Sequence, residues 1–172
     1  MPADRLRFGA YGAAAGCVAY GAMKLAQALG ATVLADKDPL PPDLRDRLLA
    51  RDPLFVASFW VMAGAAVIGV VVALSTVRPW GRAVPRRLVL AMVWPIGIAM
   101  VARSVGVLGF GFVGDILTLG GHPDLGSKAA LAEELARWDL LLWSPFFLIW
   151  GACWTATAVR MSRRMPSRTS GR

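Results

Sequence analysis

Four blocks of mostly apolar residues follow one another along the chain, separated by short polar segments. They cover about residues 8–34, 54–77, 88–113 and 138–159. A helix needs about 20 mostly apolar residues to cross the hydrocarbon core of a bilayer, and each block reaches that length. The pattern predicts an all-α integral membrane protein, a four-transmembrane-helix bundle in which residues 1–172 form a single transmembrane domain.

Local signals mark where two of these helices begin or bend. Asp52-Pro53 opens the second block with an N-cap acceptor followed by a proline at the first helical position. Pro145 interrupts the fourth block and removes one backbone hydrogen bond, which predicts a kink near Leu141–Leu142.

Positive charge is divided unevenly between the connections. One side carries a single acid, Asp4, and eleven cations: Arg5, Arg7, Arg78, Arg82, Arg86, Arg87, Arg160, Arg163, Arg164, Arg168 and Arg172. The other side carries ten acids and six cations: Lys37, Arg45, Arg47, Arg51, Lys128 and Arg137. Because Lys and Arg in short connections stay in the cytoplasm, both termini and the basic tail 160–172 are predicted to be cytoplasmic. Cleavage of the first block as a signal peptide after Gly30 is an alternative that leaves the remaining topology unchanged.

The outer connections contain further helical patterns. Residues 43–51 predict a short helix with leucines on one side, and residues 128–137 predict another that can run into the fourth span. Both are expected to lie at the membrane interface or to serve as plain linkers. Four-residue spacing of small side chains in the first block, from Gly9 to Gly21, predicts close contact with a neighbouring helix.

Composition narrows the class of protein further. The chain is 56% hydrophobic and 17% charged with a net charge of +8, and its excess arginine flanks the apolar blocks. No zinc-finger spacing or RNA-binding signature accompanies that charge, so nucleic-acid binding is not expected. Arginine outnumbers lysine, and alanine, glycine and valine abound. This bias is typical of a high-GC bacterium, so we expect a multi-pass protein of the bacterial plasma (inner) membrane.

Charges inside the spans are the strongest candidates for a functional site, because burying them in lipid is costly. Counting about 1.5 Å per residue from the inner ends places Lys24 and Arg103 at roughly the same height, about 24 Å up. Asp139 comes out slightly higher, at about 31 Å. The count predicts that these three side chains lie near one another in the outer half of the bundle.

Helical periodicity extends this group. Tyr20 and Gln27 share the face of Lys24, and Trp143 shares the face of Asp139. As a ligand site, the six residues would form an outward-facing pocket for an anionic or polar headgroup. As architecture, Arg103 would pair with Asp139 while Lys24 extends to the membrane surface.

The sequence contains few residues typical of metal, redox or catalytic sites. His122 is the only histidine and lies in a Gly-Gly-His-Pro turn, and Cys17 and Cys153 lie in apolar segments with no Cys-x-x-Cys. No catalytic elbow or phosphate-binding loop is present. We therefore expect no metal, no cofactor and no catalytic residue.

Several segments are similar to a known group of proteins. They are residues 19–25 (AYGAMKL) with 28–30 (ALG), residues 78–82 (RPWGR) with 85–87 (PRR), and residues 138–151. With these segments the chain resembles small four-span membrane proteins of high-GC, actinobacterial-type bacteria that are classed as a domain of unknown function. The resemblance implies a membrane location and four helices, and it brings no activity.

Three functional hypotheses are open at this point. The leading one is a non-enzymatic helical bundle that binds a lipid or a partner protein. The second is a transporter subunit for a small amphiphile, which would have to form a homo-oligomer to build a pathway. The third is a membrane enzyme that acts on a lipid or isoprenoid through Lys24, Arg103 and Asp139.

Overall fold

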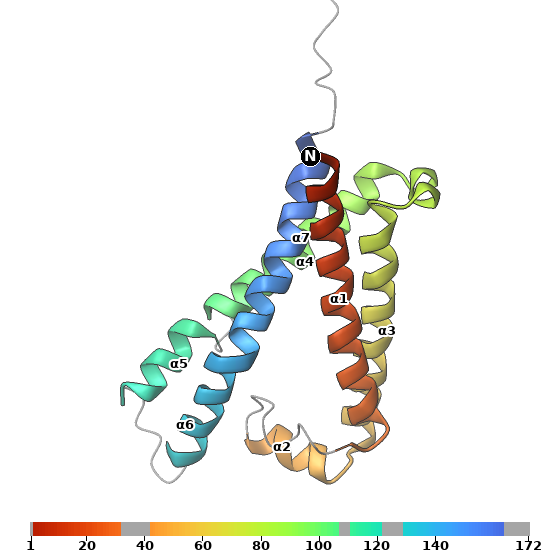
Figure 1. Ribbon diagram of the computed structural model, residues 1–172. Coiled ribbons are helices and arrows are strands. Elements are labelled where there is room, and N and C mark those ends of the chain that lie inside the picture. The colour runs from red at the N-terminus through yellow and green to blue at the C-terminus, as the bar shows by residue number, and fades with distance from the viewer. Residues whose placement is uncertain (1, 32–41, 107–110, 122–128, 164–172) are drawn as a thin grey trace, which may run out of the picture.

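The computed structural model describes residues 2–31, 42–106, 111–121 and 129–163 (Figure 1). Over these ranges the chain forms helices and no strand, which confirms the all-α prediction. The elements in chain order are α1 (Pro2–Ala28), α2 (Pro42–Leu49), α3 (Pro53–Ser75), the 3₁₀ turn η2 (Pro79–Ala83), α4 (Arg86–Val105), α5 (Phe112–Leu119), α6 (Ala129–Trp138), the π-helical turn η4 (Asp139–Trp143) and α7 (Ser144–Arg163).

Within the described residues, three helical stretches are long and apolar enough to cross a membrane: Pro53–Ser75, Arg86–Val105 and Ala129–Arg163. They suggest a membrane-embedded protein. Helix α1 has 27 residues, which at about 1.5 Å per residue is also long enough. Its apolar character comes mainly from alanine and glycine, however, so it is less hydrophobic than the other three.

The long helices are arranged as two pairs. Helix α1 runs beside α3, and α4 runs beside α7; the pairs converge near the N-terminus and separate toward α2 and α6 (Figure 1). They meet where α1 crosses α7. A Cβ atom at Gly16 would lie only 2.3 Å from Trp150, and one at Gly12 would lie 2.6 Å from the Cys153 sulfur. The small residues of α1 thus allow the close contact that their spacing predicted.

Local chemistry explains where the helices end. The Asp52 carboxylate accepts hydrogen bonds from the backbone amides of Leu54 and Phe55 at 2.9 and 3.2 Å, so the predicted N-cap of α3 is confirmed. Helix α1 ends at Ala28, earlier than residue 34, because Gly30 turns the chain with φ of 104°. The Arg51 guanidinium then donates to the Ala28 carbonyl at 3.2 Å and ties this end of α1 to the chain before α3.

The third apolar block is broken into two helices, which the sequence pattern did not predict. Helix α4 ends at Val105, and Gly106 caps it in the left-handed conformation with φ of 111°. Gly111, with φ of 120°, precedes the separate helix α5. The prediction of a single helix up to residue 113 was therefore wrong, because a glycine that adopts positive φ ends a helix readily.

The last helical stretch is continuous over 35 residues, Ala129–Arg163, as the prediction of a helix running into the fourth span allowed. The irregularity predicted near Leu141–Leu142 takes the form of the π-helical turn Asp139–Trp143 directly before Pro145. Proline has no N–H to give to the preceding turn, and the wider turn accommodates that loss.

Helix α2 contacts the end of the first helical pair. Leu48 is buried in a small cluster with Ala28 and Phe59, whereas Leu49 is exposed. One side of α2 therefore packs on α1 and α3, but the leucines do not all share it.

Candidate functional site

The structure joins two of the predicted site residues directly. Arg103 on α4 donates two hydrogen bonds to the Asp139 carboxylate, at 2.7 and 3.2 Å. The Asp139 side chain is fully buried and that of Arg103 is 17% exposed. Ser144 adds a hydroxyl donor to Asp139 at 3.3 Å. The depth count thus predicted this pair correctly, and the bidentate geometry is the strong form of an arginine–carboxylate contact.

A second buried carboxylate, which the sequence hypothesis did not include, lies beside this pair. Asp115 on α5 is 4% exposed. Its pKa is raised from 3.8 to about 7, chiefly by burial and in addition by a hydrogen bond with Asp139 and by the negative charge of Asp139, whereas the Arg103 charge lowers it. We define the charge cluster as Arg103, Asp115, Asp139 and Ser144.

Lys24 does not reach the membrane surface, so that part of the architectural interpretation was wrong. Lys24 is 5% exposed, and its ammonium donates a hydrogen bond to the side-chain amide oxygen of Gln27 at 2.9 Å. The same nitrogen lies 5.6 Å from the centre of the Tyr20 ring and 5.0 Å from that of Phe59. Aromatic rings and an amide therefore take the place of water around the ammonium.

Aromatic rings connect Lys24 with Arg103. The Tyr20 ring lies 6.0 Å from the Phe147 ring, and the Arg103 guanidinium lies 5.2 Å from the centre of Phe147. Trp143 is buried and contacts the same group through Phe146, with ring centres 6.5 Å apart. Aromatic contacts thus link Lys24, Arg103 and Trp143, whereas Gln27 and Asp139 are joined to the group by hydrogen bonds with Lys24 and Arg103. Lys24 and Arg103 occupy separate places in this group.

The sequence also contains two cysteines and one histidine as candidates for redox or metal chemistry. Cys17 and Cys153 lie on the neighbouring helices α1 and α7, and both are free thiols. Among the described residues no group of three or more His, Cys, Asp or Glu side chains is placed to hold a metal ion. His122 lies outside the described residues.

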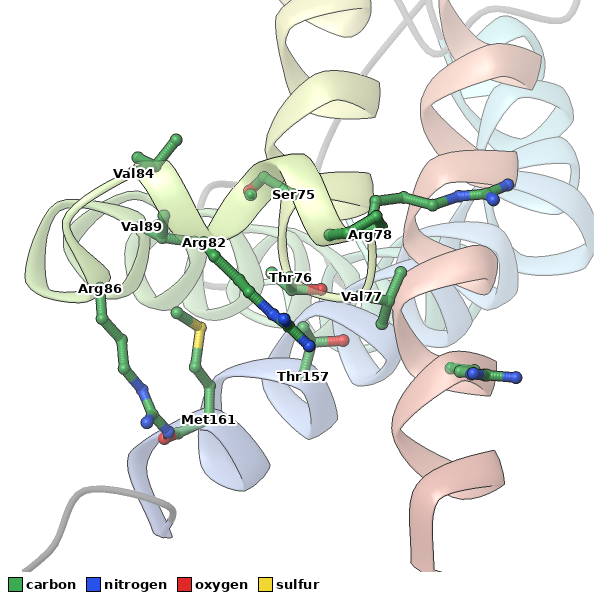
Figure 2. A pocket seen from close by; sticks show the side chains of 13 residues that line it. Ser75, Thr76, Val77, Arg78, Arg82, Val84, Arg86, Val89, Thr157 and Met161 are labelled. Atoms are coloured by element: carbon green, nitrogen blue, oxygen red, sulfur yellow. The ribbon is translucent and has the colours of Figure 1, made fainter.

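A basic pocket lies at the opposite end of the molecule from α2 and α6, where η2 and the ends of α1 and α7 come together (Figures 1 and 2). It encloses about 690 Å³. Among the described residues four arginines line it, and no acid does. We define the basic pocket by these arginines, which are Arg7, Arg78, Arg82 and Arg86.

The arginines enter the basic pocket from three elements and do different things there. Figure 2 shows Arg82 and Arg86 extending from η2 and the start of α4 toward α7. Arg86 donates to the Met161 backbone carbonyl and so ties α4 to α7. Arg78 extends toward α1, where its guanidinium lies 5.9 Å from the centre of the Tyr11 ring.

The hydroxyl groups of the basic pocket are already committed to their own helices. Ser75 and Thr76 donate to backbone carbonyls of α3 at 2.7 Å each, and Thr157 donates to Cys153 at 2.8 Å. Hydrogen-bond donors for a ligand must therefore come from the guanidinium groups. The sequence had placed these arginines on one side of the membrane but gave no sign that they share a pocket.

The family described as "Protein of unknown function (DUF3995)" has a model that matches residues 17–154. The chain belongs to this family. No curated protein and no solved structure matches the chain. In this DUF3995 chain the matched range contains the whole charge cluster, Lys24 and three of the four arginines of the basic pocket.

These two places offer different chemistry. In the charge cluster an arginine is already paired with a carboxylate, so an incoming anion would have to displace Asp139. The basic pocket is lined by several arginines, and no carboxylate of the described part of the chain lines it. The basic pocket is therefore the better candidate for binding an anionic ligand, and the charge cluster is the better candidate for holding the helices together.

Proposed function

We propose that this DUF3995 chain is a non-enzymatic membrane protein of four spans that binds an anionic phospholipid through the basic pocket. The observation that carries the proposal is the pocket of about 690 Å³, which the described residues line with four arginines and no acid. Ligand pockets commonly enclose about 300–1,000 Å³. A guanidinium group matches a phosphate with two parallel hydrogen bonds, so several of them around one hollow favour a phosphate headgroup.

The fourth span in this proposal is α1. It lies alongside the spanning helices α3 and α7, with Gly21 against Ala66 of α3 and Gly16 against Trp150 of α7. Its outer face exposes apolar side chains, among them Val18 and Leu25. A helix that runs beside spanning helices with such a face is best solvated by lipid.

The proposed orientation places the basic pocket in the cytoplasmic leaflet of a bacterial inner membrane. Figure 1 shows the N-terminus, the end of α7 and the connection between α3 and α4 at one end of the molecule. Nearly all of the excess arginine flanks these segments. Anionic lipids give that leaflet a negative surface potential, which attracts basic residues with about 1 kcal/mol per Lys or Arg.

The walls of the basic pocket also suit a lipid. Val77, Val84 and Val89 contribute apolar surface next to the arginines. Val71, one turn before Ser75 on α3, is exposed, so an acyl chain could lie along that helix while its phosphate meets the guanidinium groups.

The orientation is tested by replacing two exposed alanines, one at each end of the molecule, with cysteine. Each variant serves as the control for the other. Ala83→Cys in η2 and Ala50→Cys after α2 are each made in a chain that also carries Cys17→Ala and Cys153→Ala. An impermeant thiol reagent added outside intact cells should label Ala50→Cys and spare Ala83→Cys until the cells are opened. The reverse pattern would contradict the proposed topology.

Lipid binding is tested by thermal unfolding of the purified chain in a neutral detergent. Added phosphatidylglycerol should raise Tm more than the same amount of zwitterionic phosphatidylcholine, since a ligand at 100 times its Kd stabilises by about 2.7 kcal/mol. The difference should shrink with added salt, because exposed charges are screened. Equal stabilisation by both lipids at every salt concentration would contradict the proposal.

A further inference from the structure

The chain is irregular on both sides of the charge cluster. On one side the backbone leaves α4 at Gly106 and enters α5 after Gly111, with positive φ at both glycines. On the other side lies the π-helical turn Asp139–Trp143. Such π-helical turns occur frequently at functional sites, and here one carries the fully buried Asp139.

Helix α5 buries its polar side and exposes its apolar side, the reverse of a surface helix on a water-soluble protein. Its only charged residue, Asp115, is buried, whereas Val113, Ile116 and Leu117 are exposed. Burying a carboxylate is costly unless hydrogen bonds or an opposite charge compensate it. The side chains around Asp115 must therefore supply that compensation.

The Arg103 charge favours both carboxylates, but three hydrogen bonds from Arg103 and Ser144 go to Asp139. The Arg103 guanidinium donates two hydrogen bonds to the Asp139 carboxylate. The Ser144 hydroxyl donates a third to the same carboxylate. Asp115 Oδ2 is buried and has no hydrogen-bond partner among the described residues. Yet helix α5 packs against the π-helical turn that carries Asp139, and a hydrogen bond between the two carboxyl groups contributes to the raised pKa of Asp115.

Two ionised carboxylates have no hydrogen to share, since both are acceptors only. One proton changes this, because a protonated carboxyl donates to a carboxylate. It would satisfy the unpartnered oxygen of Asp115, and the net charge of Arg103, Asp115 and Asp139 together would become zero. Among the described residues no other acid intervenes: Glu133 and Glu134 on the adjoining helix α6 are exposed, and Arg137 on α6 pairs with Glu133 at 3.8 Å.

We propose that Asp115 and Asp139 together bind one proton beside Arg103, and that this proton fastens α5 to the π-helical turn. The site is a carboxylic acid–carboxylate pair, independent of the basic pocket and of lipid binding. Its loss at high pH leaves two negative charges against one guanidinium group, so α5 is then held less tightly.

The direction of the pH effect follows from the Asp115 pKa, which is raised from 3.8 to about 7 chiefly by burial. The folded chain then binds this proton more tightly than the unfolded chain does. The stabilisation is complete below about pH 4, declines as the pH rises, and is lost above about pH 7.

The test compares Tm of the full chain in detergent at pH 5 and pH 8. Wild type should lose roughly 4–8 °C between these values. Asp115→Asn should lose much less, because its amide donates to Asp139 at every pH. The matched control Glu134→Gln, an exposed acid on α6, should behave like wild type. An undiminished loss in Asp115→Asn would overturn the proposal.

Infrared spectroscopy of the unmodified chain gives a second readout that does not depend on a variant that folds. A buried carboxylic acid band should be present at pH 6, where ordinary aspartates are ionised, and should disappear by pH 8. Hydrogen exchange of α5 should accelerate over the same range. Absence of the band at pH 6, or exchange of α5 that ignores pH, would overturn the proposal.

Discussion

Arginine occurs in two opposite environments at the two ends of this bundle. At one end Arg103 is mostly buried and forms a bidentate contact with Asp139. At the other end Arg78 and Arg82 are exposed and line a pocket to which the described residues contribute no acid. The residue type is the same, but only one of these settings has its charge neutralised within the protein.

The difference follows from solvation. A buried guanidinium loses water and must regain an equivalent partner from the protein, so the chain supplies Asp139 to Arg103. An exposed guanidinium keeps its water and needs no partner for the protein to fold. Its charge is then available to an anionic ligand. Burial thus separates the arginine that stabilises the fold from the arginines that can bind a ligand.

The largest expected effect comes from breaking the buried pair. Arg103→Leu and Asp139→Leu should each lower the stability of the purified chain, by roughly 3–5 kcal/mol where a charge is left unpaired. Asp139→Leu should cost less than Arg103→Leu, because Asp115 remains beside the guanidinium. Thermal or denaturant unfolding in detergent measures both losses.

The double variant separates pairing from packing. If the two side chains stabilise the fold through each other, Arg103→Leu combined with Asp139→Leu should recover much of the loss. Fully additive losses would show that the contact is incidental and would remove the contrast between the two ends.

A smaller effect is expected at Lys24. Lys24→Met keeps most of the apolar stem but removes the hydrogen bond to Gln27 and the contacts with the Tyr20 and Phe59 rings. An unsatisfied buried polar group costs about 1–3 kcal/mol, and Tm should fall accordingly. Leu25→Met, on the exposed side of the same turn, serves as the control and should leave Tm nearly unchanged. A rise in Tm for Lys24→Met would instead indicate an ammonium held for a ligand.

The smallest effect on stability is expected in the basic pocket. Arg78→Gln and Arg82→Gln remove exposed charges, and such substitutions usually change stability by less than about 0.5 kcal/mol. Without lipid, both variants should unfold like wild type in neutral detergent. A loss comparable to that of Arg103→Leu would mean that these arginines are also structural.

Much of the fold was predictable because apolar length and proline are direct signals. The blocks predicted α3, α4 and α7, and Pro145 predicted the irregular turn before it. Counting residues along helices also predicted that Arg103 meets Asp139, since helical rise converts sequence position into depth.

Other features depend on contacts that no local pattern contains. Lys24 was expected to reach water, but Phe59 from another helix covers it. Asp115 was taken for the end of a long span, because the positive φ of Gly106 and Gly111 is not visible in an apolar run. The basic pocket exists only because η2 turns back toward α7, which brings Arg82 near Thr157 (Figure 2).

Native mass spectrometry of the chain with phosphatidylglycerol tests the proposed binding site most directly. Wild type and the control Arg47→Gln/Arg137→Gln, which removes two exposed arginines at the opposite end, should retain bound phosphatidylglycerol. Arg78→Gln/Arg82→Gln should retain at least tenfold less while unfolding normally, since each lost charged hydrogen bond is worth about 1.5–3 kcal/mol. Equal retention by the two double variants would contradict lipid binding in the basic pocket.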